Sequence, residues 1–119
     1  MPRPKALTQG EMRVMALALP EAHESSHMGT PDFRVRNKIF ATIPPTSPGR
    51  VVLKMTPANV DALVRRDPAT FVDVWRGRWI GIELARITRE EIRELMADAW
   101  QVAAPKSVVK AHAKRLTFR

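Results

Sequence analysis

The chain has 119 residues, enough for one hydrophobic core and too few for two, so we expect one domain spanning residues 1–119. Hydrophobic residues make up 45% and charged residues 27%, a composition that excludes disorder throughout. No apolar run approaches the roughly 20 residues that cross a bilayer, and the N-terminus lacks the apolar core of a signal peptide. We therefore expect a cytoplasmic protein. The absence of cysteine excludes disulfides, thiolate metal sites and a cysteine nucleophile.

The charge balance is strongly basic. Lysine and arginine number 20 against 12 acidic residues, which gives a formal charge of +8 and a pI near 11.1. Such a field attracts polyanions, among them nucleic acids. The alternative is that the charge serves solubility or reflects an arginine-rich host proteome. The positions of the cations therefore matter more than their number.

Residues 8–19 carry the signals of a first helix. Thr8 is followed three residues later by Glu11, and this capping box can satisfy two backbone N–H groups at a helix start. Apolar residues then recur at helical spacing until Pro20 ends the run.

From residue 22 to residue 55 the apolar period changes to two, which indicates strands. Phe33 and Val35 are expected to face the core, whereas Arg34 and Arg36 alternate with them and form a basic outer face. Asn37-Lys38 is the expected tight turn of this hairpin. The core positions expected on its second strand are Ile39, Ala41 and Ile43. A proline-rich loop over residues 44–49 then leads into a strand over residues 50–55.

The second half of the sequence predicts three helices and one strand. Thr56-Pro57 is a capping residue followed by a first-turn proline, and it opens a helix over residues 57–66. A turn over residues 75–78 precedes a strand over residues 79–84. A second capping box, at Thr88 and Glu91, opens an amphipathic helix over residues 88–103, which Pro105 ends. A last helix is expected over residues 106–115.

The expected order is therefore α-β-β-β-β-α-β-α-α, without the βαβ rhythm that a parallel sheet requires. This order predicts an α+β fold, a two-layer sandwich in which helices pack on one face of an antiparallel sheet.

Several short motifs in this order resemble those of the MmcQ/YjbR family, and the resemblance covers nearly the whole chain. The motifs are Leu19-Pro20 with Glu24-Ser25, Gly29 with Pro31-Asp32-Phe33-Arg34-Val35, Lys38-Ile39-Phe40-Ala41, Leu53-Lys54 before Thr56-Pro57, Trp79, and Ala104-Pro105-Lys106. The resemblance implies a CyaY-like or secretion-chaperone-like α+β fold. It also implies DNA binding through a double-wing arrangement of hairpins, and it supplies no catalytic residues.

One motif suggests zinc chemistry. The segment from His23 to His27 matches H-E-x-x-H, which binds zinc when a helix brings both imidazoles to one face. Here the segment lies between Pro20 and Gly29 and is expected to be extended, which separates the histidines by about 13 Å. No nucleophile elbow or Gly-rich phosphate loop is present either. We therefore expect no metal, no cofactor and no enzymatic activity.

The basic residues form three clusters, on the first hairpin, in the turn before Trp79 and in the C-terminal tail. Such cations could neutralise phosphates, and Trp75 could stack on a base or wedge at a base step. The alternative is a solvated surface with Trp75 at the edge of the core, and core packing is the favoured reading of Trp79 and Trp100. The candidate nucleic-acid-binding residues are Arg34, Arg36 and Lys38, then Arg76 and Arg78, then Lys106, Lys110, Lys114 and Arg115, with Arg119 in the same tail.

These observations favour a module that binds nucleic acid, most of all duplex DNA, mainly through phosphates. Two alternatives stay open. One is a protein-interaction module that uses a sheet edge or a groove between helices. The other is a binder of a small acidic ligand in the concave face of the sheet. One continuous basic face would favour DNA, whereas dispersed cations would favour a protein partner.

Overall fold

The computed structural model describes residues 6–113. Its strands form one antiparallel sheet of six, in the order β1-β2-β3-β4-β6-β5, which confirms the α+β class. The elements are α1 (Gln9–Leu17), β1 (Ala22–His27), β2 (Thr30–Val35), β3 (Lys38–Thr42), β4 (Arg50–Lys54), α2 (Pro57–Arg66), β5 (Phe71–Trp75), β6 (Trp79–Glu83), the 3-10 helix η1 (Leu84–Arg86), α3 (Arg89–Ala103) and α4 (Lys106–Ala111).

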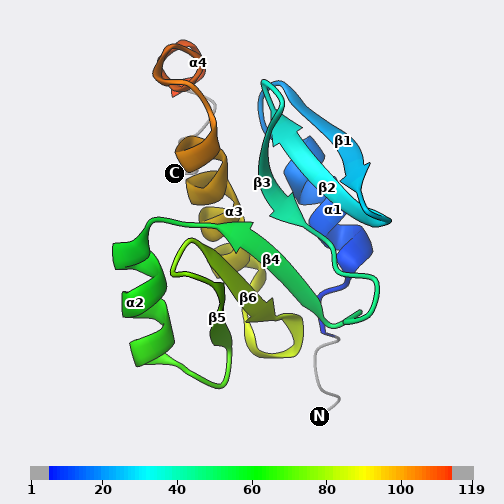
Figure 1. The fold of residues 1–119 in the computed structure, drawn as a ribbon, viewed down its shortest axis with the longest axis vertical. Coiled ribbons are helices and arrows are strands. Elements are labelled where there is room, and N and C mark those ends of the chain that lie inside the picture. Colours follow the sequence, from blue (N-terminus) through cyan, green and yellow to red (C-terminus); the bar gives the residue numbers. More distant parts are fainter. Residues whose placement is uncertain (1–5, 114–119) are drawn as a thin grey trace.

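The molecule has two layers. Helices α1 and α3 lie behind the sheet in Figure 1, α1 against β1, β2 and β4 and α3 against β2, β3 and β4. Their apolar sides and the inward side chains of the strands form the core, in which Phe33, Phe40 and Trp100 are fully buried. The side of the sheet that faces the viewer is crossed by no helix of residues 6–113. We call this side the uncovered face; the strand side chains that point away from the core lie on it.

Threonine caps start the long helices where the sequence predicts them. The Thr8 hydroxyl accepts a hydrogen bond from the Glu11 amide at 3.1 Å, and the Glu11 carboxylate accepts one from the Thr8 amide at 3.0 Å. Thr56 and Thr88 cap α2 and α3 through their hydroxyls alone, which accept from the Asn59 and Glu91 amides. The capping box predicted at Thr88 is therefore only half formed, because the Glu91 carboxylate pairs with Arg66 instead. The ends of the helices differ more from expectation: α1 stops at Leu17, and residues 114–115 of the predicted last helix lie outside the described residues.

The three β-hairpins with tight turns, β1–β2, β2–β3 and β5–β6, each turn through two residues with positive φ, as a type I′ turn requires. The turns are Met28-Gly29, Arg36-Asn37 and Arg76-Gly77. The middle turn corrects the prediction of Asn37-Lys38, because Arg36 takes the first left-handed position and Lys38 already belongs to β3. Asn37 does lie in the turn, but it takes the second left-handed position and not the first.

A β-bulge changes which residues of β3 enter the core. Phe33 lies opposite Ala41 and Arg34 opposite Ile39, so Phe40 is an extra residue on β3. Both Phe40 and Ala41 consequently point inward and are buried, while Ile39 is only half-buried. The expected alternation of Ile39, Ala41 and Ile43 is therefore wrong at its first position.

The sheet also contains β5, a strand that the sequence analysis does not predict. It follows α2 and pairs only with β6, so that it forms one edge of the sheet. Phe71 points into the core, whereas Val72 and Val74 remain partly exposed. The prediction of core packing is confirmed for Trp100, whose Nε1 donates to the Pro20 carbonyl at 2.9 Å.

Candidate nucleic-acid interface

Two of the hairpin turns lie at the same end of the sheet. Ala41 lies opposite Leu53, so β3 begins where antiparallel β4 ends. Lys54 at that end of β4 lies opposite Trp79, the first residue of β6. The turn between β2 and β3 and the turn between β5 and β6 therefore share one end, and each carries an arginine at its first left-handed position.

Helix α4 joins this end through Glu21. The Glu21 carboxylate accepts from Arg36 Nε at 2.7 Å and pairs with His112 Nε2 at 3.0 Å. Both partners lower the pKa of Glu21 below its ordinary value, and Arg36 has the larger effect. Figure 1 shows α4 beside the tip of the β2–β3 hairpin. Helix α4, which carries the exposed Lys106 and Lys110, therefore lies near the β2–β3 turn.

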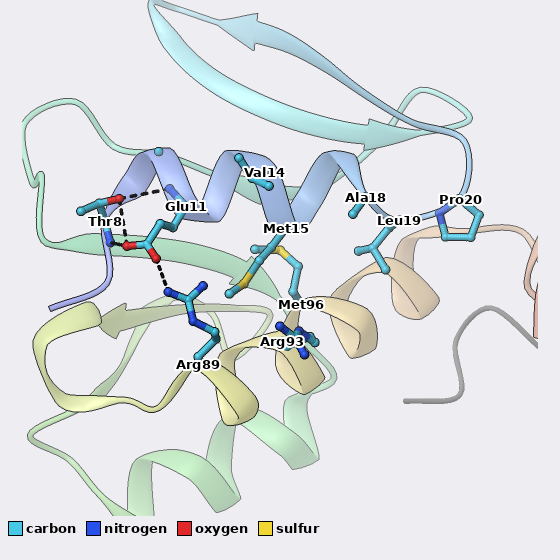
Figure 2. Close-up of a pocket in the computed structure, with 11 residues that line it drawn as sticks. Thr8, Glu11, Val14, Met15, Ala18, Leu19, Pro20, Arg89, Arg93 and Met96 are labelled. Atoms are coloured by element: carbon cyan, nitrogen blue, oxygen red, sulfur yellow. Dashed lines mark hydrogen bonds and ion pairs between the residues drawn. The ribbon is translucent and has the colours of Figure 1, made fainter. Parts of the chain in front are cut away.

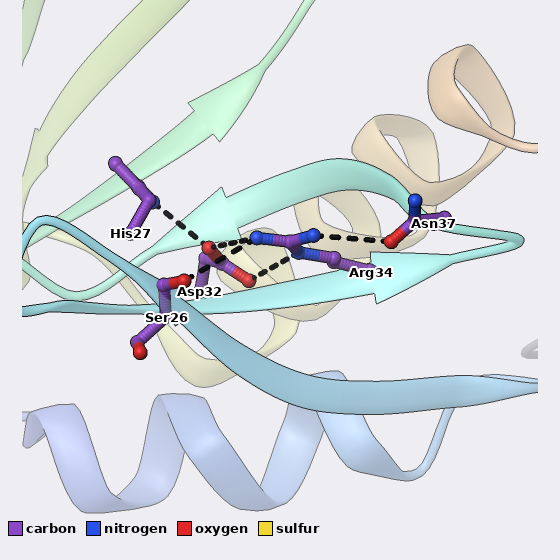
Figure 3. Close-up of polar contacts among 5 residues, drawn as sticks. All are labelled: Ser26, His27, Asp32, Arg34 and Asn37. Carbon is purple, nitrogen blue, oxygen red and sulfur yellow. Dashed lines mark hydrogen bonds and ion pairs between the residues drawn. The ribbon is translucent and has the colours of Figure 1, made fainter.

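Arg34, by contrast, serves an internal role. Its guanidinium donates to both oxygens of Asp32, from Nε at 2.8 Å and from Nη2 at 3.0 Å, and to Asn37 Oδ1 at 3.0 Å (Figure 3). The Asp32 side chain is completely buried, and His27 Nδ1 lies 2.8 Å from its second oxygen. The Arg34 guanidinium is the main reason that the pKa of Asp32 lies below its ordinary value, with a smaller effect of His27, while burial opposes both.

The predicted cations thus divide into engaged and available groups. Arg34 and Arg36 each hold a carboxylate. Arg76 has no ion pair within residues 6–113 and lies over the Trp75 ring, with 5.1 Å between the guanidinium carbon and the ring centroid. Exposed cations without an ion pair among residues 6–113 are the ones best able to meet a phosphate. We call Lys38, Arg76, Arg78, Lys106 and Lys110 the basic end. Lys114, Arg115 and Arg119 lie outside the described residues.

Two tryptophans stand beside the basic end on the uncovered face. Trp75 lies opposite Trp79 across β5 and β6, and its side chain is 54% exposed. Trp79 is half-buried, with the Lys54 ammonium 5.7 Å from its ring centroid. Each ring therefore has a cation next to it. Core packing, expected for Trp79, holds for that residue only in part.

A separate cavity of about 530 Å³ lies between α1 and α3, away from the basic end's hairpin turns. Figure 2 shows Met15 and Met96 facing each other across it, with Val14 along α1 and Arg93 beside Met96. At one end Arg89 pairs with Glu11, which lowers the pKa of that carboxyl. An apolar cavity of this size between two helices could accept a small ligand or the side chains of another protein.

The H-E-x-x-H segment forms strand β1, as expected, and so lacks the helical geometry of a zinc protease site. His27 Nδ1 contacts the Asp32 carboxylate at 2.8 Å. No group of three potential metal-binding side chains comes together within residues 6–113. No helix in this part of the chain is long and apolar enough to cross a membrane.

Sequence reasoning missed two residues of this region. Asp32 was treated only as part of a family motif, although its spacing of two from Arg34 on a strand places both side chains on one face. Lys54 was likewise not among the candidate cations, although it ends β4 directly opposite Trp79. In both cases the signal was strand periodicity, which also located the hairpin.

Comparison with known proteins places the fold in context. A crystal structure of a Deinococcus radiodurans protein, DR2400, described as a DUF419 domain, has a TM-score of 0.74 and 22% identity, over 92% of this chain and 87% of that one. A structure of a Pseudomonas syringae protein has a TM-score of 0.64 and 17% identity, over 82% of this chain and 100% of that one. No curated protein matches the chain. The YjbR family model, however, matches residues 17–102, most of the sequence, and the chain therefore belongs to the YjbR family.

Proposed function

We propose that the protein binds nucleic acid, and duplex DNA in particular, by laying the phosphate backbone across the basic end. The role is binding without catalysis. The observation that carries the proposal is the sheet register, which brings the β2–β3 and β5–β6 turns to one end of the sheet. Cations that are far apart in sequence are thereby brought to one end of the sheet.

The charge on the basic end is available because few acids compete for it. Lys38, Arg78 and Lys110 are exposed and form no ion pair within residues 6–113. Glu21, which lies between α4 and the hairpin tip, is already held by Arg36 and His112. A phosphate can therefore meet these cations without first breaking a salt bridge, whereas Arg34 would have to leave buried Asp32.

A salt series with a labelled duplex tests the proposal. Contact with about three to five phosphates predicts a slope of about −3 to −4.5 for log K against log salt. The double variant Lys38→Ala, Arg78→Ala should weaken binding to duplexes of every sequence alike and make the slope shallower by about two, because phosphate contacts carry no base information.

The matched control is Arg65→Ala. Arg65 is 80% exposed in the last turn of α2, and its one ion pair within residues 6–113 is with Asp61 in the same helix. It lies at the end of α2 that leads into β5, opposite the basic end. This variant also removes one surface charge, but it should leave the slope unchanged. Because Arg65→Ala removes one charge and the double variant removes two, a loss of binding free energy in Arg65→Ala half as large as that in the double variant would mean that net charge alone attracts DNA. An unaltered affinity in the double variant would reject the basic end as the interface.

A second candidate function is supported by α1. Val14 and Leu17 on this helix are 69% and 41% exposed, and Val14 lines the cavity between α1 and α3. Apolar side chains at such positions are typical of a groove that receives a helix of another protein. The duplex titration separates the candidates, because a failure to bind DNA at low salt would leave this groove as the site with the better support.

A further inference from the structure

The uncovered face of the sheet carries an apolar patch next to the basic end. Gly81 of β6 lies beneath it: a Cβ placed on Gly81 would lie 2.9 Å from Val74 Cγ1 and 3.0 Å from Val72 Cγ1. Both valine side chains consequently extend over Gly81 on the face opposite to the buried Ile80 and Ile82. We call Val72, Val74, Trp75 and Trp79 the tryptophan patch.

A β-bulge sets the orientation of Trp75. Asp73 lies opposite Ile80 and Trp75 opposite Trp79, which leaves Val74 as the extra residue of β5. The bulge allows Val74 and Trp75 to project from the same face, where regular alternation would turn one of them inward. Asp73 stabilises the chain at this point, since its carboxylate accepts from the Trp75 amide at 3.1 Å and from the Gly77 amide at 2.9 Å.

The charges around the tryptophan patch favour an anionic partner. Lys54 lies over Trp79 and Arg76 over Trp75, and neither cation has an ion pair within the described part of the chain. Two acids lie near the patch. Glu83 on β6 is held by Arg50 at 2.7 Å, and the Asp73 carboxylate is engaged by the backbone amides of Trp75 and Gly77. Exposed aromatic rings interleaved with cations are the arrangement by which proteins hold single strands, since bases stack on the rings and phosphates meet the cations.

From these observations we propose that the tryptophan patch is a stacking site for an unpaired base of a nucleic acid whose backbone lies on the basic end. The inference rests on the function proposed above and specifies its substrate as DNA or RNA with a single-stranded segment. Bases inside a duplex are stacked on one another and cannot lie on the Trp75 ring, so a duplex uses the cations alone. A single strand uses both.

The experiment compares a fluorescein-labelled ten-nucleotide oligothymidine with a duplex of the same length, by anisotropy at about 50 mM salt. Trp75→Leu keeps an apolar side chain but removes the ring. It should weaken single-strand binding by about 5- to 150-fold, the range of one lost stacking interaction, and leave duplex binding unchanged. Trp75→Phe should restore part of the loss. The single strand should also quench the tryptophan fluorescence of the unmodified protein, because Trp75 is exposed whereas Trp100 is buried.

The outcomes separate this inference from the proposed function. If neither oligonucleotide binds at 50 mM salt, both are wrong. If the duplex binds with the expected salt slope but Trp75→Leu leaves single-strand binding unaltered, the stacking site alone is rejected. The stacking site is also rejected if Trp75→Leu converts a dimer to a monomer in sedimentation, because the tryptophan patch would then be a contact between copies of the chain.

Discussion

The buried pair of Asp32 and Arg34 gives the sharpest prediction about stability. Replacing Arg34 with methionine keeps much of the side chain's volume but leaves the buried Asp32 carboxylate with His27 as its one remaining side-chain partner within residues 6–113. Loss of one partner from a buried pair costs about 3–5 kcal/mol. We expect the lower end, about 3 kcal/mol, because Arg34 is 19% exposed and His27 retains its contact. At about 2.1 cal/mol/K per residue, this loss lowers Tm by roughly 12 °C.

The neighbouring arginine on the same hairpin provides the control. Arg36 also pairs with a carboxylate, that of Glu21, but the two side chains are 57% and 34% exposed. Because water can replace either partner, Arg36→Met should cost less than about 1 kcal/mol. Urea unfolding of both variants measures the difference. If Arg34→Met falls within about 1 kcal/mol of Arg36→Met, the reasoning from burial is refuted.

The same pair predicts a pH dependence. Because the pKa of Asp32 in the folded protein lies below the unfolded value of about 3.9, the pair's contribution is complete above pH 4 and is lost as pH falls through the folded pKa. In Arg34→Met the carboxyl keeps its burial and loses its main stabilising partner, which raises its pKa. The stability gap between the two proteins should therefore narrow as the pH is lowered toward and below the ordinary carboxyl value of about 3.9, and a gap that does not change on acidification would contradict the assignment.

Two further predictions concern local packing and capping. Gly81→Ala, measured by urea unfolding, should destabilise by about 1–2 kcal/mol, because its Cβ would collide with Val72 and Val74; a gain in stability, as expected for an unhindered glycine in a strand, would show that these valines can move aside. Thr88→Ala should cost about 1 kcal/mol through loss of the hydrogen bond from the Glu91 amide, whereas Thr88→Ser should be nearly neutral, and equal costs would assign the effect to the lost methyl group.

The parts of the fold that local chemistry determines could be predicted from the sequence. Thr8, Thr56 and Thr88 mark helix starts correctly because a cap involves only residues within one turn of each other. Strand β5 was missed for the converse reason. It has only five residues, and Val72 and Val74 lie on the face that no helix covers, so the buried side of the strand gives almost no pattern to read.

The candidate site was predictable in composition but not in arrangement. The sequence identifies which segments are basic, yet the strand order that brings the turns at Arg36 and Arg76 to one end depends on pairing between distant segments. Whether a cation is available depends on tertiary partners as well. In the sequence Arg34 and Lys38 are equivalent cations of one basic hairpin. In the fold Arg34 binds a buried carboxylate, whereas Lys38 is exposed.

The two edges of the sheet differ in how they resist aggregation. The β1 edge displays histidine, glutamate and serine side chains, which discourage pairing with another chain. The β5 edge is apolar, and its protection comes from the bulge at Val74, which interrupts the regular row of backbone groups that a foreign strand would need. The β-bulge that turns Trp75 outward thus also protects the β5 edge strand from pairing with another chain.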